Sequence, residues 1–168
     1  MMKENIKFGL TISALALSGC YGNHLPKMSP IPEINGHKVE IREAPYEGKC
    51  STKQVYDDKL RDYKYLVSCN PIWLNHHVKP SAQLFVLFHE IGHIQLGHVQ
   101  AEGIYLSKEM KKQVHIDADC YSGKMMRDVY HYTPEQFSEV YDLLRYDHQS
   151  PERETALHAC LEEMVIER

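Results

Sequence analysis

The stretch LFVLFHEIGHIQLGHVQ, residues Leu84 to Gln100, places three histidines and a glutamate in an otherwise apolar run. Its apolar residues cover most of the circumference of a helix that opens at Pro80, and a helix that is apolar all round is a buried one. Gly97 is well placed to end this helix as a C-cap. Buried imidazoles and carboxylates without partners are costly. The sequence therefore predicts that a metal ion satisfies them; core histidines satisfied by hydrogen bonds are the alternative.

The motif HEIGH gives this prediction a chemical form. His89 and His93 are four residues apart, so both imidazoles project from one face of the helix, one turn apart. This spacing lets two nitrogens bind one Zn²⁺ at about 2.0–2.1 Å. Glu90 is turned by about 100° from His89, which keeps it off the metal but near a metal-bound water. The pattern predicts zinc-dependent hydrolysis with Glu90 as the general base.

A catalytic zinc needs a third protein ligand, and His98 is the nearest further histidine. It is turned by about 140° from His93 and lies past the expected helix end, so we expect a cap or a partner of a ligand instead. The metzincin pattern is excluded, because Leu96 and Val99 stand where it requires glycine and histidine.

The downstream string HIDADCYSG, residues 115–123, resembles the ligand helix of short gluzincin-like metallopeptidases. These include the prenyl-protein and heat-shock membrane proteases and the neutral zinc metallopeptidases, which follow HExxH with E-x-x-A-D-x-[FY]-[AS]-G. The resemblance implies that His115, in place of the glutamate, is the third zinc ligand and that Asp119 orients a ligand histidine. Asp117 is the alternative ligand if the helix starts one residue later. Three histidines also suit copper, iron and nickel.

The same families often carry a THPxxxxR-like element after the zinc helices. Here YDHQSPERETALHACL offers His148 and Arg153, with Gln149 in place of the proline. The resemblance implies that one of them approaches the substrate oxyanion or a ligand. A solvated histidine and an exposed arginine at a helix start are the alternative.

The first twenty residues, MMKENIKFGLTISALALSGC, predict an export signal over residues 1–19. Lys3 and Lys7 precede an apolar run that is too short to span a membrane. The run ends at Leu17-Ser18-Gly19-Cys20, which resembles a bacterial lipobox and implies that Cys20 is lipidated and anchors the chain to a membrane. Tyr21, rather than aspartate, then implies the periplasmic side of the outer membrane in a Gram-negative cell. An ordinary signal peptide is the alternative.

Export into an oxidising compartment changes the expectation for the four remaining cysteines. They allow three pairings, of which sequence order favours Cys50–Cys69 and Cys120–Cys160. Four free buried thiols are the alternative.

The 168 residues suffice for one domain, which we place at residues 46–168 behind a proline-rich tether at residues 20–45. Beyond a short strand at KVEI in the tether, we expect a strand near Tyr65–Cys69, ended by Asn70 and Pro71. Helices are expected from Pro80, over about residues 112–129, after the capping residue Thr133 and after Ser150. The predicted fold class is α+β and mostly helical, a minimal zincin-like domain with an active-site helix, a ligand helix and a small sheet.

The formal net charge of −4 and the pI of about 6.2 give no electrostatic support for nucleic-acid binding. Two functions remain. The first is a lipid-anchored zinc peptidase acting on envelope proteins or peptides. The alternative is a non-catalytic zinc-binding accessory lipoprotein that retains the fold. His115 in the ligand position favours the alternative, whereas retention of Glu90 favours the enzyme.

Overall fold

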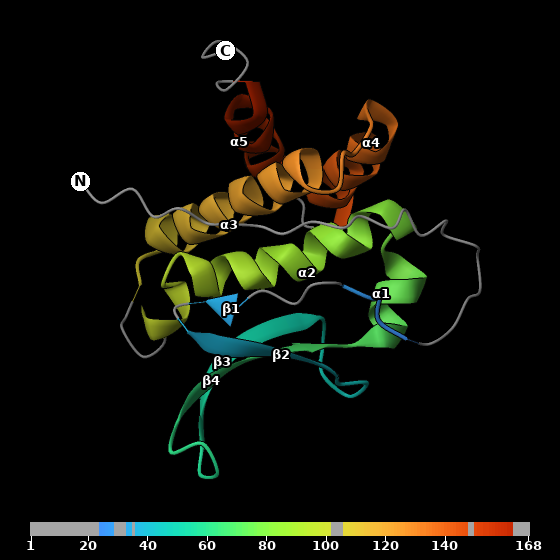
Figure 1. Cartoon of the computed structure of the whole chain (residues 1–168). Coiled ribbons are helices and arrows are strands. Elements are labelled where there is room, and N and C mark those ends of the chain that lie inside the picture. The colour runs from blue at the N-terminus through green and yellow to red at the C-terminus, as the bar shows by residue number, and fades with distance from the viewer. Residues whose placement is uncertain (1–23, 29–32, 35, 102–105, 148–149, 163–168) are drawn as a thin grey trace.

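The structure is a computed structural model that describes residues 24–28, 33–34, 36–101, 106–147 and 150–162. These residues form an α+β fold that is mostly helical, as the sequence predicts (Figure 1). The chain order is β1 (Glu33–Ile34), β2 (His37–Glu43), β3 (Cys50–Asp57), β4 (Asp62–Cys69), α1 (Pro71–His77), α2 (Pro80–Gln95), a 3₁₀ turn (His98–Ala101), α3 (Lys108–Asp128), α4 (Pro134–Asp142), a π-helical turn (Leu143–Asp147) and α5 (Pro151–Glu162).

The sheet has the strand order β1-β2-β4-β3. Strand β2 runs parallel to β4, and β3 pairs antiparallel with β4 through a hairpin. The expected strand near Tyr65–Cys69 is the C-terminal part of β4, where all five residues are buried. The strand expected at KVEI lies in β2, so the sheet includes part of the segment suggested as a tether. Pairing between β2 and β4 is non-local, and no local pattern in the sequence signals it.

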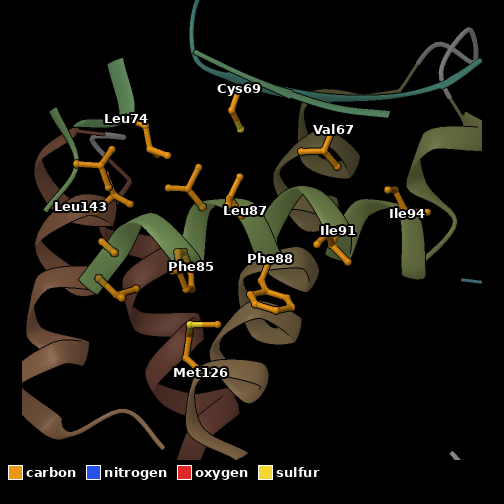
Figure 2. Packing of buried hydrophobic residues seen from close by; sticks show 14 of the residues in the cluster. Val67, Cys69, Leu74, Phe85, Leu87, Phe88, Ile91, Ile94, Met126 and Leu143 are labelled. Atoms are coloured by element: carbon orange, nitrogen blue, oxygen red, sulfur yellow. The ribbon is translucent and has the colours of Figure 1, made fainter. Parts of the chain in front are cut away.

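Helix α2 lies between the sheet on one side and α3 and α4 on the other (Figure 1). This position explains its all-round apolar sequence, because both of its faces are covered. Leu87 points toward Cys69 of the sheet, whereas Phe85 and Phe88 point toward Met126 of α3 (Figure 2). The HEIGH motif therefore lies on the most deeply buried helix, where its backbone is held rigidly.

Small residues let α3 pack closely against its neighbours. A Cβ atom at Gly92 of α2 would lie 3.2 Å from the Ala118 carbonyl oxygen, and one at Gly123 would clash with Leu157 of α5. The Ser122 hydroxyl donates a hydrogen bond to the Phe85 carbonyl oxygen at 2.7 Å. The alanine, serine and glycine of the ligand-helix string thus hold α3 against α2 and α5.

Capping residues define most of the helix boundaries. Helix α4 begins at Pro134 with the predicted capping box between Thr133 and Gln136. Gly97 follows α2 with a φ of 75°, a left-handed conformation that favours glycine and ends the helix. Helix α3 begins four residues before the expected start, capped by the Ser107 hydroxyl.

Helix α1 was not expected from the sequence, where Asn70 and Pro71 were assigned only to the end of a strand. The Asn70 side chain accepts hydrogen bonds from two backbone N–H groups of α1, and Pro71 occupies the first turn. The same two residues thus end β4 and begin α1.

Two disulfides, Cys50–Cys69 and Cys120–Cys160, are the pairings favoured by sequence order. The first joins directly opposed residues of β3 and β4. The second joins α3 to α5 across a Cα–Cα distance of 5.9 Å. Each disulfide lies beside a wall of the cleft described below.

The predicted signal at residues 1–19, the lipidation site Cys20, and His148 lie outside the described residues. Among the helices that the structure describes, none is long and apolar enough to cross a membrane.

Candidate metal centre and cleft

His89 and His93 of α2 point their Nε2 atoms at one another across 3.1 Å. Their rings are nearly perpendicular, with centroids 4.7 Å apart, as expected for imidazoles one helical turn apart. His89 is buried and His93 is half-buried. The two side chains therefore converge on one point beside the helix, as the HEIGH spacing predicts.

His115 of α3 completes this cluster. Its Nδ1 atom lies 3.3 Å from the His89 Nε2 atom, and the ligand atoms of the three histidines lie within 4.8 Å of one another. Tetrahedral zinc with bonds of about 2.0–2.1 Å separates its nitrogen ligands by about 3.3–3.4 Å. The distances of 3.1 Å from His89 to His93 and 3.3 Å from His89 to His115 are close to that separation. The three residues therefore fit a metal ion of this kind.

Asp117, the alternative third ligand, does not join the cluster. Its carboxylate accepts a hydrogen bond from the Gln113 side chain at 2.7 Å, and it is not one of the three residues whose ligand atoms converge. The geometry therefore favours His115 over Asp117.

Hydrogen bonds to the other ring nitrogens orient the two helix histidines. The Nδ1 atom of His89 lies 2.7 Å from an Asp119 carboxylate oxygen, to which it donates, so His89 Nε2 keeps its lone pair. The Nδ1 atom of His93 lies 3.0 Å from His98 Nδ1. A proton on His93 Nδ1, donated to His98, would leave His93 Nε2 free as a ligand. His98 thus contacts the ring nitrogen of His93 that faces away from the cluster.

Two of the three histidines are kept neutral. Burial, followed by the neighbouring histidines, lowers the pKa of His93 to about 2. His115 is the most exposed of the three, and partial burial of its ring with the nearby His89 and Arg153 lowers its pKa to about 4. Burial also lowers the pKa of His98. At neutral pH His93 and His115 therefore present lone pairs rather than cations, which is the form that binds a metal.

Asp119 is itself held by an arginine. It is fully buried, and it accepts hydrogen bonds from the Arg153 Nε and Nη2 atoms of α5 at 2.7 and 2.8 Å. Burial alone would raise the pKa of Asp119, but the hydrogen bonds from His89 and Arg153 lower it. Asp119 thus remains a carboxylate between an imidazole and a guanidinium, and Arg153 reaches the site through this contact.

Glu90 lies on the other side of His89, facing the sheet. Its carboxylate accepts a hydrogen bond from the Thr52 hydroxyl of β3 at 2.7 Å, and its backbone carbonyl oxygen lies 3.1 Å from the same hydroxyl. Glu90 is absent from the histidine cluster but lines the same cleft as His89 and His115. The Glu90 carboxylate thus shares a cleft with two of the three histidines without joining their cluster.

The cleft beside the cluster has a volume of about 250 Å³. Polar and charged groups line it together with apolar side chains from β3, α1, α2, α3, the π-helical turn and α5. The lining residues are Lys49, Cys50, Trp73, Phe85, Val86, His89, Glu90, His115, Leu143 and Arg153. A reacting group and a small apolar substituent could both be held here.

Sequence reasoning did not identify Lys49, Thr52 or Trp73. None of these residues lies in a motif. Lys49 and Trp73 reach the cleft, and Thr52 reaches Glu90, only because β3 and α1 fold beside α2. The single sequence signal near them is Cys50, whose disulfide with Cys69 fixes the start of β3 beside the end of β4.

Comparison with known proteins gives one match. A family model described as Peptidase_M78, the IrrE N-terminal-like domain, matches residues 35–115, a little under half of the chain. No curated protein and no solved structure matches the chain significantly. The matched range includes Glu90 and all three histidines of the cluster and ends at His115. With the geometry of the histidines, this similarity supports a metallopeptidase-like family for the chain.

Proposed function

We propose that this protein is a zinc-dependent peptidase. The observation that carries the proposal is the convergence of His89, His93 and His115 on one point, with the Glu90 carboxylate beside them in the cleft. Three protein ligands leave an open position on a tetrahedral metal, and that position is what distinguishes a catalytic site from a structural one.

When bound, zinc would lower the pKa of a water molecule towards 7 and polarise a peptide carbonyl. His89, His93 and His115 would hold the metal, and Glu90 would be the group that accepts a proton from water and delivers it to the leaving amine. The Thr52 hydroxyl holds the Glu90 carboxylate in place through the 2.7 Å hydrogen bond. A fixed orientation of the base favours this transfer, because the carboxylate need not find its position during the reaction.

We propose two roles for Arg153 in this mechanism. Its bidentate contact with Asp119 makes it a positioning residue for His89. Because it also lines the cleft, we propose that it adds positive potential where the oxyanion develops. His148 remains our proposed second oxyanion donor.

A non-catalytic zinc-binding module is the second candidate. The histidine at position 115 favours it, because the related ligand helices carry a glutamate there. A binding module needs no general base, however, and the hydrogen bond between Thr52 and Glu90 would then serve the fold alone.

We further propose that the chain acts in the bacterial cell envelope, anchored through a lipid on Cys20. Its substrates would then be envelope proteins or peptides within reach of the tether. Labelling cells with an alkyne fatty acid tests the anchor: labelling that depends on Cys20 is expected. A soluble, unlabelled mature protein would contradict it.

Substitution Glu90→Gln tests the peptidase directly. The neutral amide cannot accept the proton of water, and loss of a general base costs about 10²–10⁴-fold in rate. Zinc content and fold should be unchanged, because Glu90 is not a ligand. Hydrolysis of a broad peptide library by both proteins is the measurement. Equal hydrolysis by both would rule out Glu90 as the base, and hydrolysis by neither would favour the binding module.

A further inference from the structure

A lysine and a tryptophan form the part of the cleft that the peptidase mechanism does not use. The Lys49 Nζ atom lies over the Trp73 ring, 5.4 Å from its centroid. Both side chains line the same cleft as His89 and Glu90. A cation at this distance from an indole is attracted to the ring face and is held in a preferred position.

The junction between β4 and α1 fixes these two residues relative to each other. The Asn70 backbone N–H donates to the Lys49 carbonyl oxygen at 2.9 Å. The Asn70 side-chain oxygen accepts from the backbone N–H of Trp73 at 3.1 Å. The Asn70 amide also donates to the Glu47 carbonyl oxygen at 2.7 Å. The disulfide of Cys50 closes the junction from the next residue. Asn70 therefore fixes the backbone at both Lys49 and Trp73, and the exposed Lys49 side chain lies over the ring from this fixed start.

The positive charge of Lys49, unlike that of Arg153, is available to a ligand. The Arg153 guanidinium is bound by Asp119, and the Glu90 carboxylate is bound by Thr52. No carboxylate pairs with Lys49 within the part of the chain that the structure describes. A cation with no carboxylate partner, in a cleft with apolar walls, favours an anion.

The lining of the cleft places this anion near the reacting bond. Lys49, His89, Glu90 and His115 all line the same cleft, which has a volume of about 250 Å³. A peptide with a carbonyl at the histidines therefore places a neighbouring residue at Lys49, and an anion at Lys49 belongs to that residue.

We propose that Lys49, held over Trp73, is the substrate-recognition residue for a carboxylate carried by a residue next to the scissile bond. This inference rests on the proposed peptidase function and names its substrate class: short or terminal peptides with a carboxylate at that position. The carboxylate can be the C-terminal α-carboxylate or the side chain of an acidic residue, since both present the same two oxygens to an ammonium group.

Peptide binding to the Glu90→Gln protein tests the proposal without requiring turnover. The probes are N-acetyl-Ala-Phe as the free acid, the same dipeptide as the carboxamide, and N-acetyl-Ala-Glu as the carboxamide. Calorimetric titrations are run on zinc-loaded and on chelated protein, because a metal ion can itself hold a carboxylate. The free acid should bind roughly fivefold tighter than its carboxamide, the upper end for an exposed ion pair.

Three further variants assign this preference to its residue. Lys49→Met should abolish the difference between acid and carboxamide, and Lys49→Glu should reverse it. Lys53→Met is the matched control, because Lys53 is an exposed lysine of β3 that does not line the cleft. It should keep the full preference. Thermal denaturation verifies that each variant is folded.

The outcomes separate this inference from the proposed function. Equal affinity for acid and carboxamide, or a preference that survives Lys49→Met, overturns the role of Lys49 even if peptides are hydrolysed. A Lys49-dependent preference without hydrolysis by the wild-type protein supports the recognition site and contradicts the peptidase. Tight binding of the glutamate carboxamide identifies a side-chain carboxylate as sufficient, whereas binding of the free acid alone identifies the C-terminus.

Discussion

The two walls of the cleft are built in different ways. The helical wall, from α2, α3 and α5, carries His89, His115 and Arg153. The strand wall, from the start of β3 and from α1, carries Lys49, which directly precedes β3, and Trp73. Side chains of the helical wall form a continuous set of contacts from Arg153 through Asp119 and His89 to the other histidines. The strand wall is set by backbone hydrogen bonds around Asn70. The helical wall is thus suited to fixing a metal, and the strand wall to holding a substrate.

Removing one disulfide from each wall gives the largest expected effects on stability. Loop-closure entropy assigns about 4 kcal/mol to Cys120–Cys160, which closes 40 residues, and about 3 kcal/mol to Cys50–Cys69, which closes 19. Denaturant unfolding of the two double alanine variants measures these losses. Metal affinity should fall only in the Cys120/Cys160 variant, because that disulfide holds the helix that carries Arg153.

An equal loss of metal affinity in both disulfide variants would contradict the assignment of metal binding to the helical wall alone. It would mean that the two walls form one cooperative unit around the histidines. Loss of peptide binding without loss of metal in the Cys50/Cys69 variant would support separate roles for the two walls.

Arg153→Met should weaken metal binding by about 10–100-fold, the range for removing a group that supports a metal ligand. Without the arginine, the Asp119 carboxylate loses two hydrogen bonds and no longer holds the His89 ring firmly in its present orientation. Competition with a zinc chelator measures the change. Arg61→Met is the control, because Arg61 is an exposed arginine between β3 and β4 and does not line the cleft.

A positioning role for Arg153 also predicts that its effect depends on Asp119. In a double-mutant cycle, Arg153→Met should weaken zinc binding much less when Asp119 is already asparagine. Additive losses would show that Arg153 acts on the site by another route.

The difference between the walls also explains what the sequence could predict. The positions of His89, His93, Glu90 and Asp119 could be predicted, because they follow from spacings within one helix or within one short string. The Thr133 capping box was predictable for the same reason. Local spacing fixes such positions once the helix forms.

The strand wall was not predictable because its parts meet only after folding. Lys49 and Trp73 are 24 positions apart in the sequence, and no periodicity links them. Thr52 reaches Glu90 across 38 positions through the contact between β3 and α2. Helix α1 was missed because Asn70 and Pro71 serve both as the end of a strand and as the start of a helix.

Substitution Thr52→Val has the smallest expected effect. It tests the hydrogen bond between the Thr52 hydroxyl and the carboxylate of the proposed base, Glu90. Loss of a single hydrogen bond to a carboxylate is worth about 1.5–3 kcal/mol at most, and solvent in the cleft can replace part of it. We expect the hydrolysis rate to fall by about tenfold or less. Steady-state kinetics and zinc analysis should find lower kcat with unchanged metal content. Loss of metal would show that Thr52 supports the histidines as well.

Metal content of the purified protein tests the central claim most directly, namely that three histidines from two helices form one metal centre. Elemental analysis after dialysis should find close to one zinc per chain in the wild-type protein and almost none in His115→Ala. His98→Ala and Asp117→Ala should keep the metal, because neither side chain is a ligand. A wild-type protein that binds no metal, or a His115→Ala variant that keeps it while His98→Ala or Asp117→Ala loses it, would contradict the account.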